Sequence, residues 1–77
     1  MTVSIGDLAI GDRGRVVRLL PGNRGYRERL LAMGLTPGTE FVLKRLAPLG
    51  DPVELSVRGT AISLRRAEAA MLQVEQI

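Results

Sequence analysis

The sequence contains neither cysteine nor histidine. Without cysteine no disulfide can form, which excludes the disulfide-stabilised scaffolds common among small secreted proteins. Without either residue no Ser-His or Cys-His nucleophile can be assembled, so the serines have no imidazole base to activate them. We therefore expect no enzymatic activity, no catalytic residue and no cofactor.

The same absences argue against a transition-metal site, because Fe²⁺ and Zn²⁺ favour imidazole or thiolate ligands. Carboxylates such as those of Glu28, Glu40 and Asp51 bind hard cations only weakly unless they cluster, and these three are scattered along the chain. A phosphate-binding Gly-x-x-x-x-Gly-Lys-Ser/Thr loop is missing as well, since Lys44 follows Leu43. No metal ligand is predicted.

Long apolar segments are missing too. The longest charge-free run, residues 30–39, has ten residues and is interrupted by Gly34, Pro37 and Gly38. A membrane-spanning helix needs about 20 apolar residues. The first seven residues also lack the basic start and apolar stretch of a signal peptide. These features predict a cytoplasmic protein, which could still lie against a membrane protein.

Aromatic residues are limited to Tyr26 and Phe41, so a surface that stacks nucleic-acid bases has little to build on. The net charge of +3 and the pI of about 10.6 do fit nucleic acid, but acidic residues are interspersed among the basic ones. Only residues 24–29 concentrate arginines. The simplest interpretation of the charge is a solvated, mildly basic surface. An acidic protein partner is the second, and a small nucleic-acid-binding barrel remains an alternative.

The chain of 77 residues is long enough for one domain, residues 1–77, with one core. Tyr26, Leu30 and Met33 recur at helical spacing, and Gly34 follows at the usual stop position, which predicts a helix over residues 26–33. Alternating or apolar segments predict five strands, at 13–20, 40–46, 53–57, around 62–64 and at 72–77. Short turns are expected at 4–7, 21–23, 36–38 and 59–60, a loop at 47–52 and a helical turn within 65–71. This pattern indicates a mainly β fold: a small SH3-like barrel of about five antiparallel strands with one or two short helices.

Several motifs follow one another in order along nearly the whole chain. The central one is Arg29-Leu30 followed by Met33-Gly34-Leu35-Thr36-Pro37-Gly38. The others are Leu8, Gly11 and Gly14 near the start, Pro48 to Pro52 in the middle, and Val57-x-Gly59 and Ile62-x-Leu64-Arg65-x-x-Glu68-Ala69 in the last third. Together they resemble the motifs of the FeoA family, small bacterial accessory proteins for ferrous-iron uptake.

The resemblance implies an SH3-like barrel, a cytosolic location and no catalysis by the protein itself. It also implies a partner, FeoB, a membrane transporter with a cytosolic GTP-binding region. A similar barrel forms the C-terminal domain of iron-dependent repressors of the DtxR type, so a nucleic-acid-binding or iron-dependent regulator module is the alternative function. The oligomeric state follows from none of these motifs.

Four residues are predicted to contact that partner. Leu31 lies outside the helical stripe and beside Arg27, and Leu49 is an apolar residue in a turn-rich loop. Apolar anchors surrounded by arginine are common at the centre of interfaces. We therefore predict that Leu31 and Leu49, with Arg24 and Arg27 around them, form one docking surface. The alternative is that both leucines are buried where the helix packs on the barrel. Arg29, beside the stripe, is expected to bond backbone carbonyls of the loops.

Overall fold

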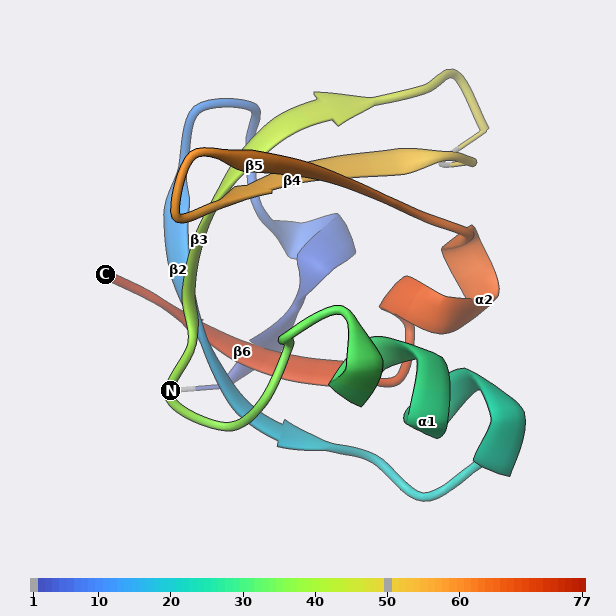
Figure 1. Ribbon diagram of the computed structural model, residues 1–77. Coiled ribbons are helices and arrows are strands. Elements are labelled where there is room, and N and C mark those ends of the chain that lie inside the picture. Colours follow the sequence, from blue (N-terminus) through green and yellow to red (C-terminus); the bar gives the residue numbers. More distant parts are fainter. Residues whose placement is uncertain (1, 50) are drawn as a thin grey trace.

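The computed structural model describes residues 2–49 and 51–77, and within them one strongly curved antiparallel sheet of six strands (Figure 1). The strands lie in the order β1-β6-β2-β3-β4-β5. Their bounds are Val3–Ser4 (β1), Arg13–Leu19 (β2), Glu40–Leu46 (β3), Val53–Val57 (β4), Thr60–Leu64 (β5) and Leu72–Gln76 (β6). The helical elements are a 3₁₀ turn η1 (Ile5–Asp7), α1 (Arg24–Ala32) and α2 (Arg66–Ala69). The predicted SH3-like barrel is confirmed.

The predicted strands are all present, and one strand was missed. β1 has only two residues, Val3 and Ser4, which pair with Val74 and Gln73 of β6. A strand this short has no alternation that a sequence pattern can reveal. Next to it, the carboxylate of Asp7 accepts hydrogen bonds from the Ser4 backbone N–H and hydroxyl, both at 3.0 Å. The short turn expected at residues 4–7 is therefore confirmed as η1.

The hairpin between β4 and β5 turns one residue earlier than predicted. Val57 pairs with Thr60, so the two turn residues are Arg58 and Gly59 rather than Gly59 and Thr60. Both have positive φ angles, 52° and 81°, as a type I′ turn requires. The twist of such a turn matches the twist of the flanking strands, and the hairpin continues directly from it.

Two irregularities and one glycine allow the sheet to curl. The register shifts between Val16 and Arg18 in β2 and between Leu43 and Arg45 in β3, and such bulges bend a strand. Gly14 lies opposite Phe41 in the β2–β3 ladder. A β-carbon at position 14 would stand 2.5 Å from the Phe41 ring, so the ring can cover the strand only because residue 14 is glycine.

Helix α1 begins two residues before the predicted start, because Asn23 caps it. The Asn23 side chain accepts a hydrogen bond from the Tyr26 N–H at 3.1 Å. The helix ends as predicted at Gly34, whose φ is 88°. The N–H of Leu35 donates to the Leu30 carbonyl and that of Gly34 to the Leu31 carbonyl, each at 3.0 Å, which is a Schellman ending. Leu30 and Leu35 are both fully buried, so this ending ties the helix to the core.

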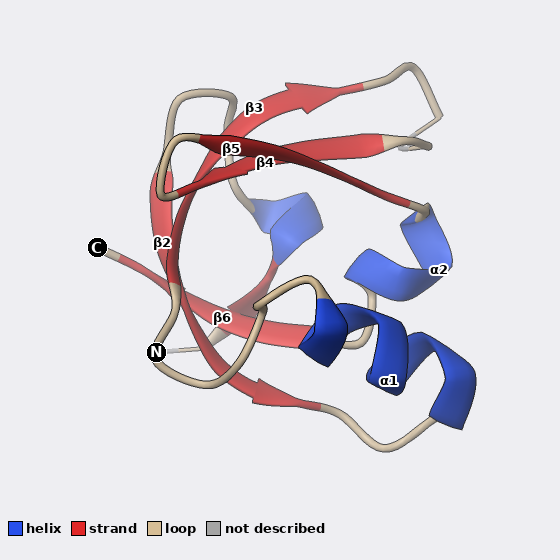
Figure 2. Cartoon of the chain, viewed as in Figure 1, coloured by secondary structure: helices blue, strands red, loops and turns tan. Residues whose placement is uncertain are grey.

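The Thr36-Pro37-Gly38 turn then returns the chain to the barrel. The Thr39 N–H donates to the Thr36 carbonyl at 3.0 Å, and Gly38 has a φ of 93°. The Gly38 N–H donates to the Val16 carbonyl at 2.7 Å, which holds the turn against β2. α1 and α2 lie side by side and cover one side of the curved sheet (Figure 2).

Candidate docking site

The loop between β3 and β4 carries the most exposed large apolar side chain of the described residues. Leu49 is 90% exposed, and its φ of 77° lies in the left-handed region. This region is unfavourable for a bulky side chain and is usually occupied by glycine, asparagine or aspartate. Holding a leucine in this conformation costs conformational free energy, and backbone strain of this kind is found most often at functional sites.

A hollow of about 520 Å³ lies beneath this loop. Its floor includes Ile5 and Val53, which belong to the buried core. Leu46 and Leu49 line it from the loop side, and α2 contributes a further wall. Ser4, Gly6, Arg66, Ala69 and Ala70 complete the lining. The hollow is thus a mostly apolar depression with one arginine in its lining, a composition suited to receive an apolar side chain of a partner.

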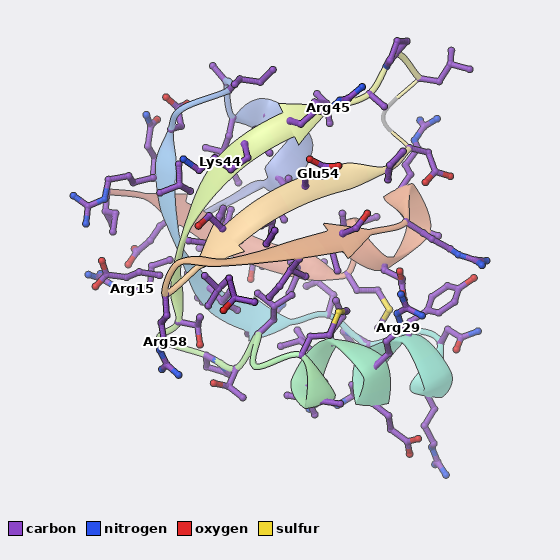
Figure 3. The ribbon with its side chains drawn as sticks, turned by 45° about the horizontal axis from the view of Figure 1, so that its top comes forward. Arg15, Arg29, Lys44, Arg45, Glu54 and Arg58 are labelled. Atoms are coloured by element: carbon purple, nitrogen blue, oxygen red, sulfur yellow. The ribbon has the colours of Figure 1, made fainter. Side chains whose placement is uncertain are left out.

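An ion pair fixes α2, and with it one wall of the hollow. The Nε atom of Arg29, which is labelled in Figure 3, belongs to this pair. It lies 2.8 Å from the Glu68 carboxylate, and the Glu68 side chain is only 2% exposed. The other carboxylate oxygen of Glu68 accepts the Arg65 N–H at 2.9 Å. Arg29 therefore pairs with a carboxylate and not, as the sequence analysis expected, with loop carbonyls. The pair joins α1 to the start of α2.

The four predicted docking residues lie on two separate surfaces. Leu49 lines the hollow, whereas Leu31, Arg24 and Arg27 lie on α1 and do not. In Figure 1, α2 stands between the β3–β4 loop and α1. The alternative in which both leucines are buried is wrong, because Leu31 is 38% exposed. The sequence places both leucines outside the core correctly, but the single patch it predicted is divided by α2.

We define the α1 surface as Arg24, Arg27 and Leu31. Arg24 and Arg27 are both exposed. An Arg27 Nη1 atom approaches the Leu19 carbonyl at 3.5 Å, a long and weak contact that leaves the guanidinium largely free. This surface therefore offers one half-exposed leucine beside two cationic groups.

Sequence reasoning missed the contribution of α2 to the hollow. Arg66 and Ala69 of α2 line it, together with Ala70 directly after this helix of four residues. The available signal was the acidic residue Glu68, because acidic side chains are favoured in the first turn of a helix. That signal locates the helix but does not reveal which element it faces.

Within residues 2–49 and 51–77, no three acidic side chains lie close enough together to hold a metal ion. No helix in this part of the chain is both long and apolar enough to cross a membrane.

Comparison with known proteins gives a consistent family. A family model described as the FeoA domain matches residues 3–76. A protein of Porphyromonas gingivalis named "Fe(2+) transport protein A/Fe(2+) transporter FeoB fusion protein" is 37% identical over 73 residues, which are 95% of this chain and 8% of that protein.

Solved structures agree with this fold. The crystal structure of an "Iron Uptake Regulatory Protein (FeoA)" is 30% identical, with a TM-score of 0.84, and the match covers 100% of this chain and 99% of that one. IdeR of T. acidophilum gives a TM-score of 0.89 at 22% identity, and the match covers 99% of this chain and 34% of IdeR. At that identity the likeness to IdeR shows a shared fold and nothing about function.

Proposed function

This chain belongs to the FeoA family, and on that premise we propose that it is a non-enzymatic accessory protein of bacterial ferrous-iron uptake. In this proposal it binds the cytosolic GTP-binding region of a FeoB-type transporter and modulates the transporter's activity or assembly. The observation that carries the proposal is the relative in which FeoA and FeoB are parts of one polypeptide. Two modules that remain covalently joined act at the same place, and a free module with the same fold is suited to bind what its relative is fused to.

We place the principal contact at Leu49 and the hollow beneath it. Because the Leu49 side chain is 90% exposed, nearly all of its apolar surface is available for burial against a partner. Complete burial of a leucine side chain contributes about 1.5–3 kcal/mol, enough for a single residue to dominate an interface. The backbone of Leu49 is already held in the left-handed region before binding, so less conformational entropy is lost when a partner binds.

The α1 surface is the second contact in this proposal. A standard interface covers about 800 Å² of each partner. The accessible surface of this protein is 4750 Å², so one partner would cover about a sixth of it. That extent allows a partner to contact both sides of α2. Arg24 and Arg27 lie at the rim, where charges chiefly affect the association rate and its salt dependence.

The test measures binding to the purified cytosolic region of the FeoB-type transporter from the same organism, by calorimetry. Leu49→Ser should weaken binding by about tenfold or more, a loss of about 1.4 kcal/mol. Leu49→Met is the matched control and should retain binding, because it keeps an apolar side chain of similar size. Since residue 49 touches little of the core, the melting temperature of both variants should equal that of the parent.

The double variant Leu31→Ser/Leu49→Ser should fold normally and fail to restore iron uptake in cells that lack the native protein. Arg24→Gln and Arg27→Gln should weaken association at low salt more than at high salt. Unchanged affinity of the double variant would refute this docking surface. Absence of binding by the parent protein would refute the proposed partner itself.

A further inference from the structure

β5 forms an open edge of the sheet. Among residues 2–49 and 51–77 it pairs only with β4, so its other side has no strand against it. The type I′ turn makes Val57 and Thr60 a bonded pair, and bonding then alternates along the ladder, so Ile62 and Leu64 also bond to β4. The N–H and C=O groups of Ala61 and Ser63 therefore point away from β4. Within the described part of the chain they have no hydrogen-bond partner.

Natural proteins usually protect such an edge with charged side chains, proline or a covering element. β5 itself contains no charged residue and no proline, and its exposed residues Ala61 and Ser63 are small. The opposite edge of the sheet is different, because β1 is only two residues long. The molecule thus keeps one short protected edge and one open edge of five residues.

An apolar hollow lies along the open edge. It measures about 450 Å³ and is bounded by the end of α1 on one side and by β5 on the other. Met33, Val57 and Ile62 provide its apolar surface, and Val57 and Ile62 belong to the core. An edge strand beside a helix with an apolar hollow between them is the arrangement in which an extended peptide adds to a sheet and inserts alternate side chains.

The ends of the edge carry positive charge. Arg58 projects from the β4–β5 turn and also lines the hollow (Figure 3). At the other end of β5, Arg65 and Arg66 follow Leu64 directly and are exposed. None of these three arginines takes part in an ion pair among residues 2–49 and 51–77. A strand that lies along β5 meets cationic groups at both of its ends.

This charge pattern decides between the possible occupants. In an antiparallel pair of β5 with β5 of a second copy, Arg58 of one copy would face Arg65 and Arg66 of the other, and like charges placed opposite each other destabilise a sheet. An extended segment with acidic residues at its ends would instead meet complementary charge. We propose that β5 binds an extended, acid-flanked segment of a partner protein by strand addition. This surface differs from the Leu49 hollow, with which it shares only Arg66.

The experiment uses a synthetic peptide of about nine residues, with two glutamates at each end and an alternating Val-Thr centre, titrated into the ¹⁵N-labelled protein. The amide signals of Ala61 and Ser63 should shift and gain protection from hydrogen exchange. A peptide with the same centre but lysines at both ends should bind at least about tenfold more weakly.

Two variants at one position separate backbone pairing from side-chain contact. Ala61→Pro removes an outward N–H, and proline is tolerated at an edge where the N–H faces solvent. It should weaken binding at least about tenfold, whereas Ala61→Val keeps the N–H and should bind like the parent. If Ala61→Pro proves unstable, Arg58→Glu combined with Arg65→Glu should reverse the preference toward the lysine-flanked peptide.

Several outcomes would overturn the proposal. The proposal is wrong if no binding is detected up to about 2 mM peptide, or if Ala61→Pro or the charge reversal leaves the peptide affinity unchanged. It is also wrong if the amide signals that shift are centred on Leu49. Concentration-dependent dimerisation that Ala61→Pro abolishes would show that a second copy is the occupant. None of these results bears on transporter binding through Leu49, which is measured separately.

Discussion

Arg29→Met is expected to destabilise the protein more than Glu68→Gln, although both changes break the same ion pair. The two partners differ in burial: the Arg29 side chain is 56% exposed and the Glu68 side chain 2% exposed. When Glu68 becomes glutamine, Arg29 can turn to water, and the amide oxygen can still accept the Arg65 N–H. When Arg29 becomes methionine, a buried carboxylate loses its counter-ion and keeps only the hydrogen bond from Arg65.

The magnitudes follow from this difference. Removal of one partner of a fully buried pair costs about 3–5 kcal/mol, because the remaining charge is uncompensated. Because the Arg29 guanidinium is half exposed, we expect Arg29→Met to cost about 3 kcal/mol, the lower end of this range. Glu68→Gln loses one charge-assisted hydrogen bond and should cost about 1.5 kcal/mol. For a domain of this size, each kcal/mol lowers the melting temperature by about 4–8 °C.

The assay is urea unfolding followed by circular dichroism for the parent, both single variants and the double variant. These four proteins form a double-mutant cycle, which should give a coupling energy of about 1–2 kcal/mol between positions 29 and 68. Equal costs for the two single variants, or a larger cost for Glu68→Gln, would refute the argument from burial. A coupling energy near zero would mean that the pair contributes nothing to the attachment of α2 to α1.

Three further outcomes are expected. Gly14→Ala should cost about 1–3 kcal/mol, because the new β-carbon meets the Phe41 ring at 2.5 Å; a melting curve like that of the parent would show that the ring moves freely aside. Gly34→Val should cost more than about 1 kcal/mol, since φ is 88° and no atom lies within 4 Å of an added β-carbon, so the penalty is conformational; Gly34→Asn, as control, should lose less. Anaerobic calorimetry should detect no stoichiometric Fe²⁺ site of micromolar affinity, because imidazole and thiolate ligands are missing, and such a site would contradict that expectation.

Local patterns predicted much of the fold correctly. The alternation of Val53, Leu55 and Val57 located β4, and the spacing of Leu30 and Met33 before Gly34 located the end of α1. Each signal is local, because a strand or helix end is specified by residues within one or two turns of it. β1 escaped prediction because its two residues are ordered by pairing with β6, more than 60 residues away.

The candidate site was predicted only in part. An exposed Leu49 follows from its place in a loop rich in proline and glycine. That Arg66 and Ala69 line the hollow beside Leu49, and that Leu31 does not, depends on how α2 packs. No residue near Leu31 carries information about α2, which follows it by more than 30 positions.

Residue types and short spacings were enough to predict the mainly β class, the helix stop at Gly34 and the lack of imidazole and thiolate groups. The pairing of Arg29 with Glu68, the separation of Leu31 from Leu49 by α2, and the open edge of β5 among residues 2–49 and 51–77 could be read only from the tertiary structure. They arise from contacts between segments distant in the chain, and the way the sheet closes determines which strand keeps an unpaired edge.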